Sequence, residues 1–194
     1  MSTPNLVLGK ISAALVFLLL LILSTLPLYA LAYTFGGVNF SEILIAAGIL
    51  LWTAVLYTII GLFFSSILKR TLLATVVTYI VVGLLTIGIP VLLLSLLSVF
   101  IPVLSMQVST PSIIAQIALF TIGWMIVSIN PLTASIATEI ARINNGSLWI
   151  LELSLSDGSA YKLLSPWIPF IFFATLMITL FILLSIQIIR RPDR

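Results

Sequence analysis

Long uncharged segments dominate this chain, and charged residues gather in the short stretches between them. No Asp, Glu, Lys or Arg occurs from residue 71 to residue 138, and segments 11–41, 43–68 and 163–189 are equally free of charge. A surface helix of a soluble protein needs a polar face, and these segments have none. Uncharged apolar runs of about 18 or more residues are typical of membrane-spanning helices. The pattern predicts an all-α fold, a polytopic transmembrane helical bundle of about five hydrophobic helices.

The first two hydrophobic segments, residues 11–34 and 43–68, are bounded by basic residues. Lys10 precedes the first segment, and Lys69-Arg70 follow the second. Cytoplasmic loops of membrane proteins carry an excess of Lys and Arg. We therefore expect both basic positions in the cytoplasm, with the turn at residues 36–42 on the other side.

Local signals mark where these two helices bend, end and begin. Pro27 lies near the end of the first segment and is expected to kink it, because proline removes one backbone hydrogen bond. Gly36-Gly37 predicts a tight turn. Ser41 is a candidate N-cap of the second helix, and Glu42 is favourable near the positive end of that helix.

Three further hydrophobic segments follow, at residues 71–101, 113–137 and 167–189. A straight helix over 71–101 would be about 46 Å long, too long for a hydrocarbon core of roughly 30 Å. A kink or break is therefore expected at Gly88-Ile89-Pro90. Residues 138–166 form a polar loop with two turn signals, Asn144-Asn145-Gly146 and Ser156-Asp157-Gly158-Ser159.

The orientation of the C-terminus depends on how many of these three segments cross the membrane. A cytoplasmic Arg190-Arg191 requires an even number of crossings after Arg70. Segment 113–137 is the candidate that fails to cross, entering the outer half of the membrane and returning. The alternative is that it crosses and leaves the C-terminus outside. We favour a multi-pass protein of the cell membrane with both termini cytoplasmic.

The amino-acid composition excludes several classes of function. The 194 residues are 62% hydrophobic and 7% charged, and they include no cysteine and no histidine. Thiol chemistry, disulfides and the usual zinc ligands are thereby excluded, and neither metal nor cofactor is expected. Proton pumps, cation antiporters and voltage sensors need charged groups at membrane depth, and the segment interiors hold none. The basic residues sit at helix ends and reflect membrane orientation rather than nucleic-acid binding.

For the polar, small and aromatic residues inside the hydrophobic segments, a structural role is favoured over a functional one. Gln116 either lines a pathway or makes an interhelical hydrogen bond, and the hydrogen bond is favoured. Gly61 and Ser65 are four residues apart, the spacing of close helix packing. Four aromatic residues lie in or beside the segments: Trp52, Tyr79, Trp124 and Trp167. Interface anchoring or packing is favoured for them over binding of a lipid-like substrate.

Three short sequence motifs along the chain point to one known protein family. The first is Thr3-Pro4 followed by Gly9-Lys10, before a Leu-rich segment that ends in a proline and Gly36-Gly37-Val38. The second is the stretch 60–66 leading into Lys69-Arg70, and the third is Ser128-Ile129-Asn130-Pro131-Leu132. Together with the basic C-terminal end, they resemble the type-2 permeases of ATP-binding-cassette transporters.

The resemblance implies a function and partners. It implies a membrane-spanning permease subunit, an exporter that forms the translocation path and is driven by a separate ATPase subunit. Residues 1–10 would be the cytoplasmic coupling region, with Thr3, Pro4, Gly9 and Lys10 at the ATPase contact. Lys69 and Arg70 would lie in a second cytoplasmic loop. Such permeases work as homomeric or heteromeric pairs, and ATP hydrolysis would reside in the partner, so this chain is not expected to be an enzyme.

The chain differs from the family pattern at its start, and two other classes of membrane protein are alternatives. Members of the family carry further helices before the Thr-Pro…Gly-Lys stretch, whereas this sequence starts there. A split subunit, a fragment or a gene with a misplaced start would each account for the difference. The competing class is a non-transporting assembly or immunity protein that acts by helix–helix contact and has no ATPase partner. A secondary transporter would need a charged group at membrane depth or an internal repeat. The sequence shows neither.

Overall fold

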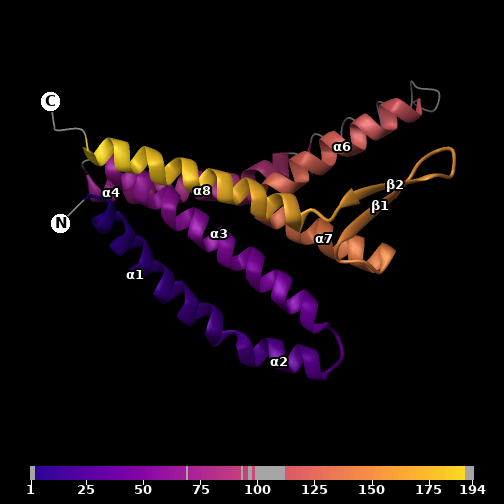
Figure 1. Cartoon of the computed structure of the whole chain (residues 1–194), viewed down its shortest axis with the longest axis horizontal. Coiled ribbons are helices and arrows are strands. Elements are labelled where there is room, and N and C mark those ends of the chain that lie inside the picture. Colours follow the sequence, from indigo (N-terminus) through magenta and orange to yellow (C-terminus); the bar gives the residue numbers. More distant parts are fainter. Residues whose placement is uncertain (1–2, 69, 93, 96–97, 99–111, 191–194) are drawn as a thin grey trace. The chain divides into compact units, whose positions relative to one another are not determined.

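The chain is mostly helical, with one small sheet (Figure 1). The computed structural model describes residues 3–68, 70–92, 94–95, 98 and 112–190. Four helical segments in this part are long and apolar enough to cross a membrane: Ser12–Thr34, Phe40–Ile67, Thr71–Leu92 and Trp167–Ile189. The apolar helix Ile113–Ile129 is shorter. The predicted helical character is confirmed, with four helices that could span a membrane, while the sheet departs from the all-α expectation.

The first apolar segment is kinked, as predicted. Helix α1 (Thr3–Ser24) and helix α2 (Leu26–Thr34) are separated at Thr25. Pro27 lies in the first turn of α2, where its missing N–H costs least. The chain then reverses at Gly36, whose φ of 74° is readily available only to glycine.

Helix α3 (Phe40–Ile67) begins earlier than the sequence suggested. Its N-cap is Asn39, so the expectation of a cap at Ser41 is wrong by two residues. The Glu42 carboxylate accepts the Asn39 backbone N–H at 3.2 Å and the Asn39 side-chain amide at 2.9 Å. A carboxylate three residues into the helix thereby closes its first turn, as in a capping box.

The third apolar segment changes its helical register at the predicted place. Helix α4 (Thr71–Gly83) runs directly into a π-helical turn, η1 (Leu84–Gly88), and the helical segment continues to Leu92. The break expected at Gly88-Ile89-Pro90 is therefore a widened turn just ahead of Pro90. The remainder of the predicted segment 71–101 lies largely outside the described residues.

Segment 113–137 is divided into two helices. Helix α6 (Ile113–Ile129) ends at Asn130, and helix α7 (Pro131–Asn145) starts immediately afterwards. The predicted polar loop 138–166 contains the second half of α7 and an antiparallel hairpin of β1 (Ile150–Ser154) and β2 (Ala160–Leu164). Gly146 ends α7 and Gly158 turns the hairpin, with φ of 66° and 82°. Both turn signals in this loop are confirmed.

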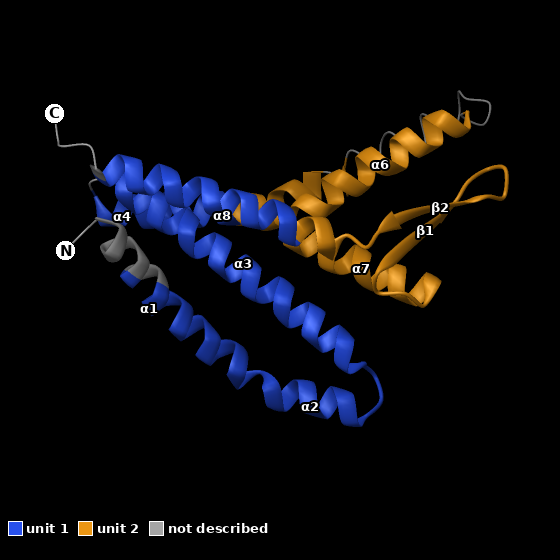
Figure 2. Ribbon diagram, in the orientation of Figure 1, with its two compact units in different colours: residues 1–82, 171–194 blue, residues 83–170 orange. Residues whose placement is uncertain are grey.

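Contacts divide the chain into two compact units (Figure 2). The first unit comprises Met1–Val82 and Ile171–Arg194, and the second comprises Gly83–Phe170. Helix α8 (Trp167–Arg190) starts in the second unit and runs through the first. The first unit is centred on Ile59, which is 1% exposed. Six partly buried apolar residues pack against it: Leu15, Val55, Leu62, Ile178, Phe181 and Ile182.

Candidate functional site

The helices of the first unit have defined directions. The Trp52 indole N–H donates to the Thr175 hydroxyl at 2.8 Å, and later residues of α3 and α8 pack together around Ile59. The two helices therefore run in the same direction. Helix α4 returns antiparallel to α3, because it follows after a short turn and brings Thr78 beside Gly61.

Consequently the start of α1, the α3–α4 turn and the end of α8 lie at one end of this unit (Figure 1). Lys10 lies in the early turns of α1, Arg70 directly precedes α4 and is exposed, and Arg190 is the last residue of α8. We call this the basic end. Lys69, the other residue predicted for the second cytoplasmic loop, falls outside the described residues.

The candidate coupling residues share one helix. Thr3, Pro4, Gly9 and Lys10 all belong to α1, which begins at Thr3. Pro4 is tolerated in the first helical turn, where its missing N–H leaves no bond unmade. Gly9 is exposed, with open space where a Cβ would lie. The predicted coupling region is thus continuous with the first span and reaches Ser24 without interruption.

The predicted packing of Gly61 is confirmed in the groove between α3 and α4. A Cβ at this position would lie 3.5 Å from Thr78 Cγ2. A pocket of about 350 Å³ opens beside this contact, towards the basic end, and is lined by small and hydroxyl-bearing residues. The hydroxyls of Thr75 and Thr78 donate to helix carbonyls one turn back.

Asn130 is the central polar residue of the second unit. Its side-chain oxygen accepts the backbone N–H groups of Leu132 and Thr133, at 2.9 and 3.3 Å, and so caps α7. Its side-chain N–H donates to the carbonyl of Leu85 in η1. Only 4% of the residue is exposed. One buried amide therefore joins the α6–α7 junction to the π-helical turn of the third span.

The Leu85 carbonyl needs this partner because of the local register. In the π turn, the N–H of Ile89 donates to Leu84 rather than to Leu85. The next residue in the same register is Pro90, which has no N–H. The carbonyl of Leu85 thus lacks its helical donor, and an unpaired buried carbonyl is costly. Asn130 supplies the missing hydrogen bond.

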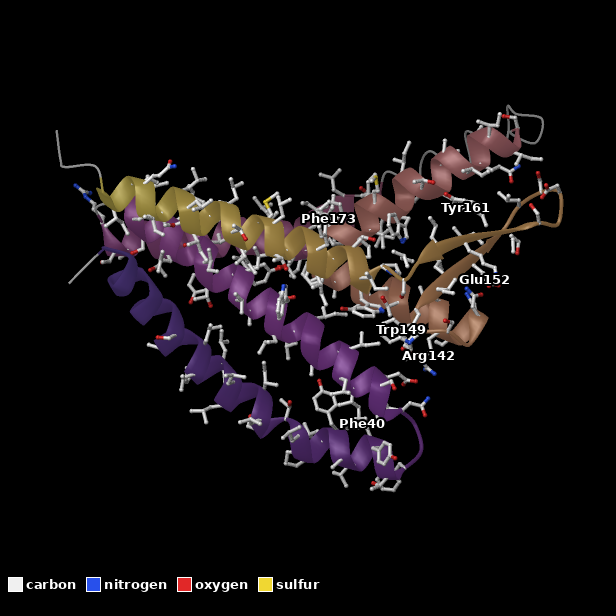
Figure 3. All side chains as sticks on the ribbon, viewed as in Figure 1. Phe40, Arg142, Trp149, Glu152, Tyr161 and Phe173 are labelled. Carbon is white, nitrogen blue, oxygen red and sulfur yellow. The ribbon has the colours of Figure 1, made fainter. Side chains whose placement is uncertain are left out.

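A row of polar contacts holds α6 to the hairpin. Gln116 donates to the Ser156 hydroxyl at 2.6 Å and accepts the Ser156 backbone N–H at 3.0 Å. The hydroxyls of Thr121 and Tyr161 lie 3.1 Å apart, with Tyr161 on β2 (Figure 3). The Trp124 indole donates to the Leu164 carbonyl at 2.6 Å. Gln116 and Trp124 therefore each hold α6 to the hairpin, and the partner of Gln116 is a hairpin turn rather than the expected second helix.

Two ion pairs lie at the surface of the second unit. Glu139 forms an ion pair with Arg142, and Lys162 forms one with Glu152 at 2.8 Å. The hydrogen bond from Arg142 holds the pKa of Glu139 below its ordinary value. The Glu152 carboxylate raises the pKa of Lys162. Hydrogen bonds from the Ser159 hydroxyl and backbone N–H lower the pKa of Asp157.

The described part of the chain holds few groups that could carry out chemistry within the candidate spans. Glu42 is the one charged residue within the four candidate spans, and it lies in the first turn of its helix against Asn39. In the same part of the chain, no group of three or more His, Cys, Asp or Glu is placed to hold a metal ion. Comparisons with protein-family models, curated proteins and solved structures find no match to this chain.

Proposed function

We propose that the chain is the membrane-spanning permease subunit of an ATP-binding-cassette exporter of the type-2 class, paired with a second permease and driven by a separate ATPase. The observation that carries the proposal is the basic end of the first unit. There the Thr-Pro…Gly-Lys stretch of α1 lies at the same end as Arg70 and Arg190. A partner that contacts residues 3–10 would meet the α3–α4 turn at the same end.

Orientation follows from the same arrangement. Four crossings return the C-terminus to the side of the N-terminus, and an excess of basic residues favours the cytoplasm. The basic end is then cytoplasmic, and residues 113–166 lie towards the opposite side. The divided helices α6 and α7 support the proposal that segment 113–137 does not cross.

Helix α1 gives the proposed coupling a physical route. The coupling residues and the first part of the span form one helix up to Ser24, so a displacement at residues 3–10 moves α1 as a rod. In the groove between α3 and α4, Gly61 and Thr78 approach closely, which lets the basic end move as a packed group. The span interiors carry no charge apart from Glu42 at the start of α3, which suits an amphipathic cargo better than a small ion.

Affinity purification from the native membrane in mild detergent tests the proposal. The tagged chain is expected to bring down a nucleotide-binding ATPase and a second permease chain. Lys10→Glu should reduce ATPase recovery, because it reverses the charge at the proposed contact. Lys162→Glu is the matched control: it reverses a charge in the hairpin of the second unit and should leave recovery unchanged.

Two outcomes would contradict the proposal. Recovery of the folded chain without any ATPase would favour a non-transporting membrane protein that acts by helix–helix contact. Equal ATPase recovery and equal ATPase stimulation with Lys10→Glu, in a chain that inserts normally, would remove Lys10 from the coupling contact.

A further inference from the structure

The sequence contains two tripeptides of the form Asn-x-Ser in which the middle residue is not proline. They are Asn39-Phe40-Ser41, at the start of α3, and Asn145-Gly146-Ser147, at the end of α7. This tripeptide is the acceptor for N-linked glycosylation, in which an oligosaccharide is joined to the asparagine side chain. Because so short a motif also arises by chance, its structural setting decides whether it is modified. The two tripeptides have different settings.

Asn145 is the last residue of α7, and an open turn follows it. Gly146 has a φ of 66°, and a Cβ at this position would meet nothing within 4 Å. The Asn145 side-chain amide donates to the Glu152 carbonyl at 3.2 Å in an exposed contact. The Ser147 hydroxyl oxygen accepts the Trp149 backbone N–H, also at 3.2 Å and exposed. Both hydrogen bonds are at the long end of the normal range, so the tripeptide is easily presented to an enzyme.

Asn39 is held at the start of α3 instead. Its side-chain amide donates to the Glu42 carboxylate at 2.9 Å, and its backbone N–H donates to the same carboxylate at 3.2 Å. Hydrogen bonds to a carboxylate are roughly twice as strong as those between neutral groups. Asn39 also directly precedes the candidate span Phe40–Ile67, whereas oligosaccharide transfer needs an acceptor that stands clear of the membrane surface. Asn39 is therefore a poor acceptor.

We propose that Asn145 is a site of N-linked glycosylation and that Asn39 is not. The donor is an oligosaccharide linked through a phosphate or diphosphate to a membrane polyprenol, and an oligosaccharyltransferase catalyses the transfer. The side-chain nitrogen of Asn145 (Nδ2) forms a bond to the anomeric carbon of the first sugar. The bond between that carbon and the phosphate oxygen breaks. The polyprenyl phosphate or diphosphate leaves with the bonding electrons, and the amide gives up one proton.

This inference rests on the membrane orientation in the proposed function but not on an ATPase partner. Asn145 lies between the third and fourth candidate spans, Thr71–Leu92 and Trp167–Ile189. With a cytoplasmic N-terminus, four crossings place this segment outside the cytoplasm, on the side where oligosaccharides are transferred to asparagine. The whole β1–β2 hairpin separates Asn145 from Trp167, so the acceptor is not held against the start of that span.

Translation of the full chain with rough microsomes, which supply both the transferase and its lipid-linked donor, tests the proposal. We expect one step to slower migration in gel electrophoresis, reversed by an endoglycosidase. Asn145→Gln and Ser147→Ala should each abolish the step. Ser147→Thr should retain it, because either hydroxyl residue completes the acceptor. Asn39→Gln is the matched control and should leave the step unchanged.

An added acceptor separates the site from the orientation. Asp157→Asn completes a further Asn-x-Ser tripeptide with Gly158 and Ser159, all three at exposed positions in the hairpin turn. Modification at position 157 of this variant with none at Asn145 would overturn the site while supporting the orientation. No modification at either position would overturn both. A step lost in Asn39→Gln would assign a glycan to Asn39 and contradict the argument from its capping bonds. None of these outcomes depends on ATPase recovery, so failure of the coupling proposal is measured separately.

Discussion

Asn130 makes three hydrogen bonds from a position that is almost fully buried. It accepts from two N–H groups of α7 and donates to one carbonyl of η1, so both ends of its amide are used. Aspartate would retain the cap but would set a carboxylate oxygen against the Leu85 carbonyl. Alanine would lose all three bonds.

Replacing Asn130 should therefore destabilise the protein measurably. Loss of an N-cap costs about 1 kcal/mol, and an unpaired buried carbonyl adds about 1–3 kcal/mol. We expect Asn130→Ala to lower the free energy of unfolding by roughly 2–4 kcal/mol, followed by tryptophan fluorescence in detergent. Asn144→Ala, at an exposed site on the same helix, is the control and should change little. Equal stability of the two variants would contradict the role assigned to the amide.

The stability of the hairpin turn should depend on pH because of Asp157. Because hydrogen bonds from Ser159 lower its folded pKa, ionised Asp157 stabilises the turn at pH values above its unfolded pKa, ordinarily about 3.9. That stabilisation is lost as the pH falls through the depressed folded pKa. The protection factors of the hairpin amides, which correct for the intrinsic change of the exchange rate with pH, should therefore fall in acid in the natural chain. Asp157→Asn should flatten this pH dependence, and an unchanged acid limb in that variant would rule the turn out as its source.

At the scale of the elements, the π-helical register of η1 and the position of Pro90 act on the same carbonyl, that of Leu85. The π register directs the N–H of Ile89 to Leu84, and Pro90 offers no N–H to Leu85. The side chain of a distant residue completes the helix instead. Such widened turns are frequent at functional sites, and this one joins α4 to the second unit.

Pro90→Ala should make Asn130 less important. An alanine N–H at position 90 can donate to the Leu85 carbonyl in the π register, so that carbonyl keeps a partner when the Asn130 amide is removed. In a double-mutant cycle, the cost of Asn130→Ala should fall by about 1 kcal/mol or more in the Pro90→Ala background. Strict additivity of the two changes would show that the two residues act independently.

The sequence predicts the elements that local signals define. Segments 43–68 and 167–189 match α3 and α8 to within a few residues, because hydropathy and charge are read directly from adjacent positions. The sequence predicts a loop where the hairpin lies, although apolar and polar residues alternate from Leu151 to Ser154 and a turn with Asp157-Gly158 follows. That alternation was the available signal.

The parts of the candidate site that depend on distant contacts were beyond the sequence. Asn130-Pro131 stands out after an apolar run, yet its partner Leu85 lies 45 residues earlier. The π register that frees the Leu85 carbonyl has no local sequence signature. In the same way, the cap at Asn39 depends on how the Glu42 carboxylate folds back, which propensity alone does not distinguish from a cap at Ser41.

At the scale of the molecule, the proposed function depends on which ends of the helices share a side of the membrane. Within the first unit, parallel α3 and α8 and antiparallel α4 bring Lys10, Arg70 and Arg190 to one end. The proposed ATPase contact requires this end to be cytoplasmic. Four crossings would then put the loop between the third and fourth candidate spans on the other side of the membrane.

Single-cysteine labelling of intact cells tests that topology most directly. Thr71→Cys marks the basic end, Gly37→Cys the α2–α3 loop and Ser154→Cys the hairpin, all at exposed positions or within a loop. A membrane-impermeant maleimide should label positions 37 and 154 in intact cells, and position 71 only after the membrane is permeabilised. Labelling of position 71 together with position 154 in intact cells would contradict the account.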